Sequence, residues 1–316
     1  MPVGHIFFVI MFSLCESALK KKHIWSELRP FPRCTGKEKK ALDMCNDKAA
    51  CKHPLPAADS QENIRNILTP VTKLKEGALG RIKDVFNIQE RRKYAFVTAA
   101  SADHFDESQE MIMTLDKYIF PHLSNYSFYY YDMGLYRSQV KLAHFDNAEY
   151  TVWLDASSRF DKGNPREMFN LLKETGVLMS PWPYPFAQHC SKHMFSYFNT
   201  EPCHFSVYHE SESGFIMLHN QPFTKRLIMD PWVACAVDPN CMCHPGAKQL
   251  YWCSFRTRKY GKCHRYDQSA INLILLQMFR RNIDSVQIPK KKYAHVSRKK
   301  GLLYLKDLHR TTPSNK

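Results

Sequence analysis

From residue 93 onward, short apolar runs alternate with longer segments in which apolar side chains recur every three or four positions. Short apolar runs are typical of buried strands, and the three-to-four-residue period is typical of amphipathic helices. We predict strands over residues 94–98, 126–131, 151–154, 177–179 and 214–218. Helices are predicted over residues 106–120, 138–145, 165–174, 221–232 and 269–279.

The alternation of strands with helices indicates the class of fold. Helices of about 10 to 15 residues between strands are typical of β-α-β units, in which the crossover helix makes neighbouring strands parallel. We therefore predict a single α/β domain over residues 93–300, with a mainly parallel (mixed) sheet flanked by helices.

The first 92 residues follow a different pattern. Residues 6–14 are apolar but too few to span a bilayer, which needs about 20 apolar residues. With the small residues Cys15 and Ser17 behind them, they predict a signal peptide over residues 1–18. A buried N-terminal strand or a truncated anchor is the alternative. Residues 19–92 are predicted to be a basic, cysteine-containing stem with a helix over 60–68, and residues 301–316 a basic tail.

The amino-acid composition indicates the compartment in which the protein is expected. The 316 residues include 44% hydrophobic residues and carry a net charge of +15, which excludes a disordered chain and a multi-span membrane protein. Eleven cysteines, ten without Cys15, could form five disulfides in an oxidising lumen. A zinc site is the alternative, although the chain has no C-x-x-C pair. Its ligands would be Cys241, Cys243, His244, Cys253, Cys263 and His264. The expected location is the secretory pathway lumen (Golgi) or the extracellular space, with no transmembrane span.

Several common catalytic motifs are absent. The first predicted strand runs into Thr-Ala-Ala-Ser at 98–101 rather than into G-x-G-x-x-G, so a dinucleotide site of the Rossmann type is not expected. The chain also contains no G-x-x-x-x-G-K-S/T loop, no G-x-S-x-G elbow and no H-E-x-x-H pair. P-loop hydrolysis, the α/β-hydrolase triad and zincin chemistry are therefore not expected.

The polar residues at strand ends are the candidates for function, because ligands of open α/β sheets bind at the carboxyl ends of the strands. Thr98 ends the first predicted strand, and Asp155 ends the third. A carboxylate there can bind a divalent cation that holds a diphosphate, and Arg159 can bind phosphate oxygens through two hydrogen bonds. The alternative is that Asp155 caps a helix and Arg159 lies on a solvated face.

Two further segments carry polar residues next to apolar elements. Glu212 precedes the strand 214–218 and is a candidate general base toward an acceptor hydroxyl. His264, Asp267 and Gln268 come just before the helix 269–279, where planar polar groups can recognise sugar hydroxyls. The alternative for Asp267 is a helix cap.

The order of these segments carries a resemblance. The chain has YAFVT at 94–98, W-x-D-x-S-x-R at 153–159, ESGFIML at 212–218 and DQSAIN at 267–272. In this order, residues 93–298 resemble a GT-A-type nucleotide-sugar glycosyltransferase domain. More closely, they resemble an animal family, expanded in nematodes, that is known as a domain of unknown function and regarded as glycosyltransferase-like.

The resemblance implies a luminal, disulfide-containing enzyme with a nucleotide-sugar donor and a glycan or protein acceptor. Asp155 would take the place of the metal-binding acid, with Mn or Mg as the implied cofactor, and Asp267 and Gln268 would lie by the sugar or acceptor. The usual D-x-D is missing, because Ala156 and Ser157 follow Asp155. Because of this departure, the alternatives are an inactive family member and a diphosphate that Arg159 neutralises instead of a metal.

Two other functions fit parts of the sequence. Basic clusters at 37–40, 290–292 and 298–300 suit a secreted, non-catalytic protein of degenerate transferase fold that binds acidic glycans. A basic chain with tyrosines at 129–131 can also stack nucleic-acid bases. Those tyrosines lie in a predicted strand, however, so a core role is favoured and no nucleic-acid partner is expected.

Overall fold

The structure is a computed structural model of the 316-residue chain. It describes residues 60–78, 92–132, 148–161, 165–205, 208–250, 253, 263–288 and 293–297. The predicted signal peptide, the helix 138–145, the three basic clusters and the tail 301–316 lie outside the described residues, as does most of the predicted stem.

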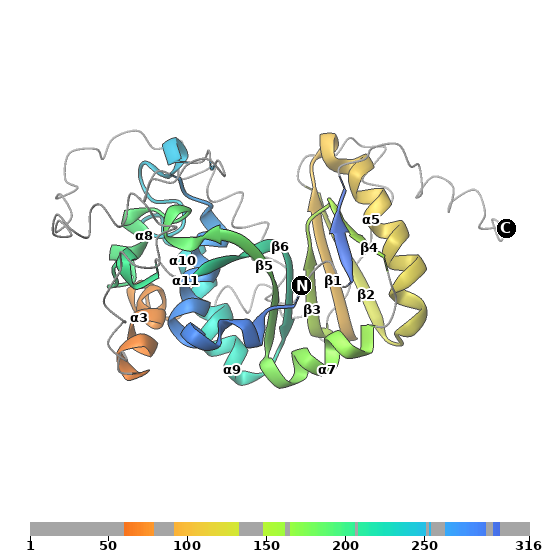
Figure 1. Cartoon of the computed structure of the whole chain (residues 1–316), viewed down its shortest axis with the longest axis horizontal. Helices are drawn as coiled ribbons and strands as arrows, with labels where there is room; N and C mark the ends of the chain where they lie inside the picture. The colour runs from red at the N-terminus through yellow and green to blue at the C-terminus, as the bar shows by residue number, and fades with distance from the viewer. Residues whose placement is uncertain are drawn as a thin grey trace.

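A five-stranded sheet forms the centre of the described domain, in the order β2-β1-β3-β6-β5 (Figure 1). Its strands are β1 (Arg92–Ala100), β2 (Tyr126–Asp132), β3 (Ala148–Leu154), β5 (Val177–Pro185) and β6 (His209–His219). β1 is parallel to β2 and β3, whereas β6 is antiparallel to β3 and β5. The sheet is therefore mixed, and the predicted α/β fold class is confirmed. A second, two-stranded sheet pairs β4 (Ser158–Phe160) with β7 (Ala294–Val296).

Helices flank the sheet on both sides (Figure 1). The α-helices are α3 (Ser60–Lys73), α5 (Phe105–Tyr118), α7 (Pro165–Thr175), α8 (Lys192–Tyr197), α9 (Pro222–Thr224), α10 (Asp230–Val237) and α11 (Tyr266–Phe279). Short 3-10 segments are η1 (Ala102–His104), η2 (Phe120–His122), η3 (Phe186–Gln188), η4 (Pro202–Phe205), η6 (Ala247–Leu250) and η7 (Arg280–Val286). The helix predicted over 221–232 is interrupted: a π-helical segment, η5 (Lys225–Met229), separates α9 from α10.

The strands are buried on both faces, so two apolar cores form. On one face, Val97 and Ile216 pack in a core that includes residues of α3, α8, α10 and α11. On the other, Phe96 and Met217 pack with residues of α5 and α7. Successive side chains of a strand point to opposite faces, which is why neighbours in β1 and β6 belong to different cores.

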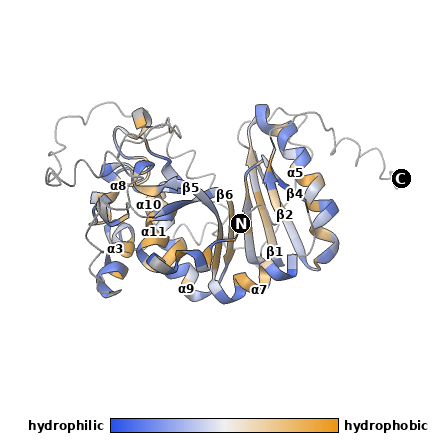
Figure 2. Cartoon of the chain, viewed as in Figure 1, coloured by the Kyte–Doolittle hydropathy of each residue, from blue (hydrophilic) through white to orange (hydrophobic). Residues whose placement is uncertain are grey.

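The helices differ in how deeply they are buried. Six consecutive positions of α11 from Ile271 to Leu276 are buried, and a helix that is apolar all round lies inside a core. α5 is amphipathic, as the alternating colours along it in Figure 2 show. α3 falls in the segment predicted as a stem, yet its Ile67 is fully buried and its Asn63 accepts a hydrogen bond from Arg280 in η7.

Most of the cysteines whose side chains the structure describes are paired in disulfides. Disulfides join Cys235 to Cys241 and Cys253 to Cys263, and Cys243 is also disulfide-bonded. Cys190 is a buried free thiol, so the prediction that ten cysteines form five bridges is wrong at this position. The alternative zinc site is also wrong, because its thiols are consumed by disulfides. Within the described part of the chain, no helix is long and apolar enough to cross a membrane.

Candidate functional site

The site lies where β3 ends against the middle of β6. Asp155 follows the last residue of β3, and its backbone N–H donates to the carbonyl of Gly214 at 2.9 Å. One carboxylate oxygen of Asp155, Oδ1, accepts the N–H of Ser157 at 3.0 Å, which fixes the turn into β4. The side chain of Asp155 is exposed, so the other oxygen can reach a ligand.

Gly214 brings two carboxylates together. A Cβ atom at this residue would lie 3.2 Å from Oε1 of Glu212 and 3.6 Å from Oδ2 of Asp155. Both carboxylates therefore lie over the same backbone position, one from each of two adjacent strands. The absence of a side chain at Gly214 is what leaves room for them.

The first turn of α11 reaches the same segment of β6. Gln268 Oε1 accepts hydrogen bonds from the backbone N–H and the hydroxyl of Ser213, both at 3.3 Å. Burial raises the pKa of Asp267 to about 6, although hydrogen bonds from the Gln268 backbone and the Ser213 side chain lower it. Gln268 Nε2 is a buried donor with no hydrogen-bond partner among the described residues. A ligand at this face would supply the acceptor that Nε2 lacks.

The structure thus brings together four of the predicted residues, Asp155, Glu212, Asp267 and Gln268, around residues 212–214 of β6. These residues come from the end of one strand, the middle of another and the start of a helix, and are separated by up to about a hundred positions in the chain. Carboxylates on adjacent strands suit a divalent cation, whereas the N-terminus of a helix suits an anionic or polar ligand.

Contacts of the buried Glu210 side chain support the start of α11. His189 Nδ1 lies 2.7 Å from Glu210 Oε1, and Arg265 Nη1 lies 3.5 Å from the same oxygen. The hydroxyl of Ser269 donates to the carbonyl of His189 at 2.8 Å. Sequence reasoning did not identify His189 or Arg265. Arg265 lies between two residues that the sequence singled out, His264 and Asp267, whereas no pattern in the sequence marks His189.

Arg159 does not reach this face, contrary to the sequence prediction. Its guanidinium is buried, with Nε 3.1 Å from Glu110 Oε2. The two terminal nitrogens donate to the carbonyls of Glu107, Ala156 and Ser158 at 2.6 to 2.9 Å. With these donors engaged inside the protein, Arg159 holds α5 against β4 rather than a phosphate.

Thr98 and His264 are also directed inward. Thr98 is fully buried, and its hydroxyl donates to the carbonyl of Leu154 at 2.8 Å, which ties β1 to β3. His264 is fully buried, with Nε2 2.9 Å from the Met242 carbonyl, and its Nδ1 accepts the N–H of Ser191 at 3.4 Å. Neither side chain is available to a donor or an acceptor sugar, and the roles predicted for them do not fit their surroundings.

The carboxylates can be tested for a fit to Mn or Mg. No group of three or more His, Cys, Asp and Glu side chains that could hold a metal occurs among the described residues. Magnesium, however, is often held by one or two carboxylates together with the phosphates of a substrate. Asp155 and Glu212 provide such a pair, so the donor set fits a cation that arrives with a diphosphate.

Comparisons with known proteins give similarities to solved structures alone. No protein-family model matches the chain, and no curated protein matches it. Among solved structures, it is similar to a galactosyltransferase, LgtC, in complex with donor and acceptor sugar analogs, with 11% identity and a TM-score of 0.34 over 57% of this chain and 70% of that one. It is also similar to WbbM, a bifunctional glycosyltransferase, with 11% identity and a TM-score of 0.36. That match covers 60% of this chain and 38% of WbbM.

Substitution of Gly214 tests the convergence of the two carboxylates. In Gly214→Ala, the added methyl group meets Glu212 Oε1 and the Asp155 side chain, and both must move aside. The backbone of Gly214 does not have a positive φ, so we expect only a small loss of stability but at least about a tenfold loss in affinity for a ligand held by both acids. Binding of a nucleoside diphosphate, measured by calorimetry beside a thermal melt, checks this. Equal affinities in the two proteins would contradict it.

Two buried histidines make stability depend on pH. Burial lowers the pKa of His244 to about 3 and that of His264 to about 4, from about 6.5 in the unfolded chain. At pH values between the folded-state pKa and 6.5, the unfolded state binds more protons than the folded state. The free energy of unfolding therefore falls as the pH falls below 6.5. Each histidine should cost about 2 kcal/mol between pH 6.5 and pH 5. Asp267, whose pKa is raised, acts in the opposite direction.

The variant His244→Gln isolates one of these contributions. The free energy of unfolding is measured in urea for the wild type and the variant between pH 7 and pH 4.5. Its slope against pH should be shallower in the variant, because unfolding of the variant takes up about one proton fewer. Asp267 is unchanged in both proteins and cancels in the comparison. Parallel curves would contradict a buried, neutral His244.

Proposed function

We propose that this protein is a glycosyltransferase, which moves a sugar from a nucleotide-sugar donor to a glycan or protein acceptor in the lumen of the secretory pathway. The observation that carries the proposal is the meeting of Asp155, Glu212, Asp267 and Gln268 around residues 212–214. The order of the sequence segments, which resembles that of GT-A domains and of the nematode-expanded family, agrees with it.

The donor is held by the two carboxylates. Asp155 and Glu212 would hold Mn or Mg, which would supply positive charge to the diphosphate of the donor. Arg159 is engaged inside the protein and does not supply that charge. The missing D-x-D is thus compensated by an acid from the adjacent strand.

The acceptor lies toward the start of α11. With a pKa of about 6, the Asp267 carboxyl is ionised near neutral pH and close enough to that pH to take a proton from an acceptor hydroxyl. The acceptor oxygen forms a bond to the anomeric carbon, the bond from that carbon to the diphosphate breaks, and the nucleoside diphosphate leaves. Gln268 Nε2 donates to a sugar hydroxyl, which satisfies its buried N–H.

A binding measurement tests the proposal without knowledge of the acceptor. UDP and GDP, each with and without Mn²⁺, are added to the full chain, and the melting temperature is recorded. A ligand at 100 times its Kd stabilises by about 2.7 kcal/mol, which corresponds to a shift of several degrees for a domain of this size. We expect one nucleotide to raise the melting temperature only with Mn²⁺. If neither nucleotide does so under any condition, the proposal fails.

A further inference from the structure

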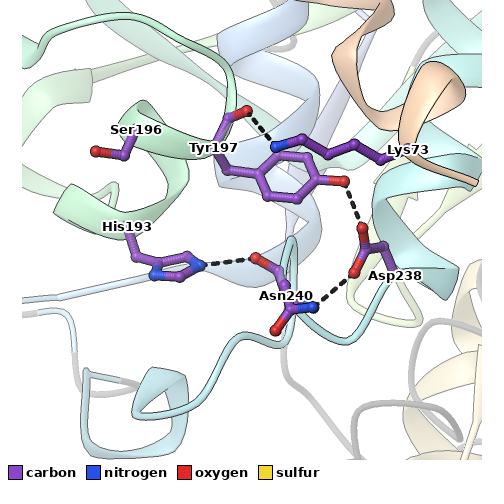
Figure 3. Close-up of a pocket in the computed structure, with 6 residues that line it drawn as sticks. All are labelled: Lys73, His193, Ser196, Tyr197, Asp238 and Asn240. Carbon is purple, nitrogen blue, oxygen red and sulfur yellow. Dashed lines mark hydrogen bonds between the residues drawn. The ribbon is translucent and has the colours of Figure 1, made fainter. Parts of the chain in front are cut away.

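A separate polar pocket of about 530 Å³ lies between α3, α8 and the loop that follows α10 (Figure 3). Six residues line it: Lys73, His193, Ser196, Tyr197, Asp238 and Asn240. None of them belongs to the candidate site around residues 212–214. The volume lies within the range of about 300–1,000 Å³ that is usual for small-molecule sites.

The charged groups of the pocket are fixed by the protein. Lys73 Nζ donates to the carbonyl of Tyr197 at 3.3 Å and lies 3.7 Å from the centre of its ring. The hydroxyl of Tyr197 donates to Asp238 Oδ2 at 2.6 Å, and the backbone N–H of Asn240 donates to Asp238 Oδ1 at 2.8 Å (Figure 3). The wall therefore contains one cation and one anion, held in place by Tyr197, and has no net charge.

Other polar groups of the pocket have unused hydrogen-bonding capacity. His193 Nε2 lies 2.8 Å from the carbonyl of Asn240, which can only accept, so Nε2 carries the proton and Nδ1 is an acceptor. Burial lowers the pKa of His193, which keeps the ring neutral at pH 7. Within the described part of the chain, His193 Nδ1, the Ser196 hydroxyl and the side-chain amide of Asn240 have no protein partner.

These groups match a ligand with several hydroxyls. An imidazole nitrogen accepts, a hydroxyl both donates and accepts, and an amide presents two donors and an acceptor, as the vicinal hydroxyls of a sugar require. A wall with no net charge favours a neutral ligand over a phosphate or a carboxylate. We propose that this pocket binds a neutral saccharide unit at a site apart from the one that carries the transfer chemistry.

Saturation-transfer NMR on the full chain tests this proposal. The probes are galactose, N-acetylglucosamine and glucuronate, each at millimolar concentration, with inorganic phosphate in a parallel titration. Ser196→Trp fills the pocket from an exposed helix position, and Ser124→Trp is the matched control on an exposed turn away from it. We expect a neutral sugar to bind the wild type and the Ser124→Trp variant equally well. The same sugar should bind the Ser196→Trp variant at least tenfold more weakly. Asn240→Ala, which keeps the backbone contacts of Asn240, should also weaken binding.

Three results would overturn the proposal. One is that no sugar binds the wild type. A second is that the sugar still binds the Ser196→Trp variant, which places it elsewhere. A third is that only the binding of phosphate or glucuronate, and not of a neutral sugar, requires Ser196. The proposal is independent of the transferase function: Asp155→Asn should leave the neutral-sugar signal unchanged, and Ser196→Trp should leave nucleotide binding unchanged, so the two proposals can fail separately.

Discussion

Replacement of Asp155 by Asn should reduce the affinity for a nucleoside diphosphate with Mn²⁺ by about 100-fold or more. The change keeps the size of the side chain and its Oδ1 acceptor for the Ser157 N–H, but removes the negative charge from one of two carboxylates. Changes in groups that only support metal ligands already cost about 10- to 100-fold, so the loss of a ligating charge should cost at least as much. Calorimetric titration of UDP or GDP in the presence of Mn²⁺ measures the effect.

The control for this variant is Asp106→Asn. Asp106 is an exposed acid in the first turn of α5 and accepts a 3.3 Å hydrogen bond from Gln109, outside the candidate site, so its loss should leave nucleotide affinity unchanged. Unchanged affinity in Asp155→Asn as well would remove the metal-binding role. The non-catalytic, glycan-binding alternative would then be the better description of the protein.

Replacement of Arg159 by Met should destabilise the protein by about 3–5 kcal/mol and leave nucleotide binding unaffected. The variant leaves Glu110 without its ion-pair partner and removes one hydrogen-bond donor from each of three buried carbonyls. Removal of one partner of a buried ion pair typically costs this much, because the remaining charge stays in the interior. Denaturant unfolding measures the loss, and Arg226→Met, at an exposed position of η5, is the matched control.

The opposite pattern would contradict the structural role of Arg159. A loss of less than about 1 kcal/mol together with weakened diphosphate binding would mean that the guanidinium reaches the ligand, as the sequence alone suggested. Because stability and binding are measured on the same variant, the two roles are separated directly.

The class of fold could be predicted from the sequence because the strongest signal, apolar runs alternating with periodic segments, survives in the structure. The run at 214–218 marks the buried half of β6, but the strand begins at His209. Residues 209–213 carry no apolar pattern, since they pair with β5 and bind polar groups of α11 instead. The direction of β6 could not be read from its residues either, because an apolar strand can pair in both directions.

The candidate site was predictable to the extent that strand ends meet at one edge of a sheet. Asp155 was chosen for that reason, whereas Glu212 lies in the middle of β6, and Gly214 leaves room for both carboxylates. Arg159 could not be placed, because its position depends on Glu110 in α5, some fifty residues earlier in the chain. A charged side chain becomes buried only where such a partner exists, and a local pattern does not reveal the partner.

The buried thiol of Cys190 has a consequence for the redox state of the whole chain. Disulfides consume cysteines two at a time, and removal of Cys15 with the expected signal peptide leaves ten, of which Cys190 is not bonded. Nine cannot pair among themselves, so a second sulfhydryl must remain or must bond to another molecule. Thiol titration of the denatured chain without Cys15 should therefore give at least two reactive groups, or at least one together with a covalent dimer on a non-reducing gel.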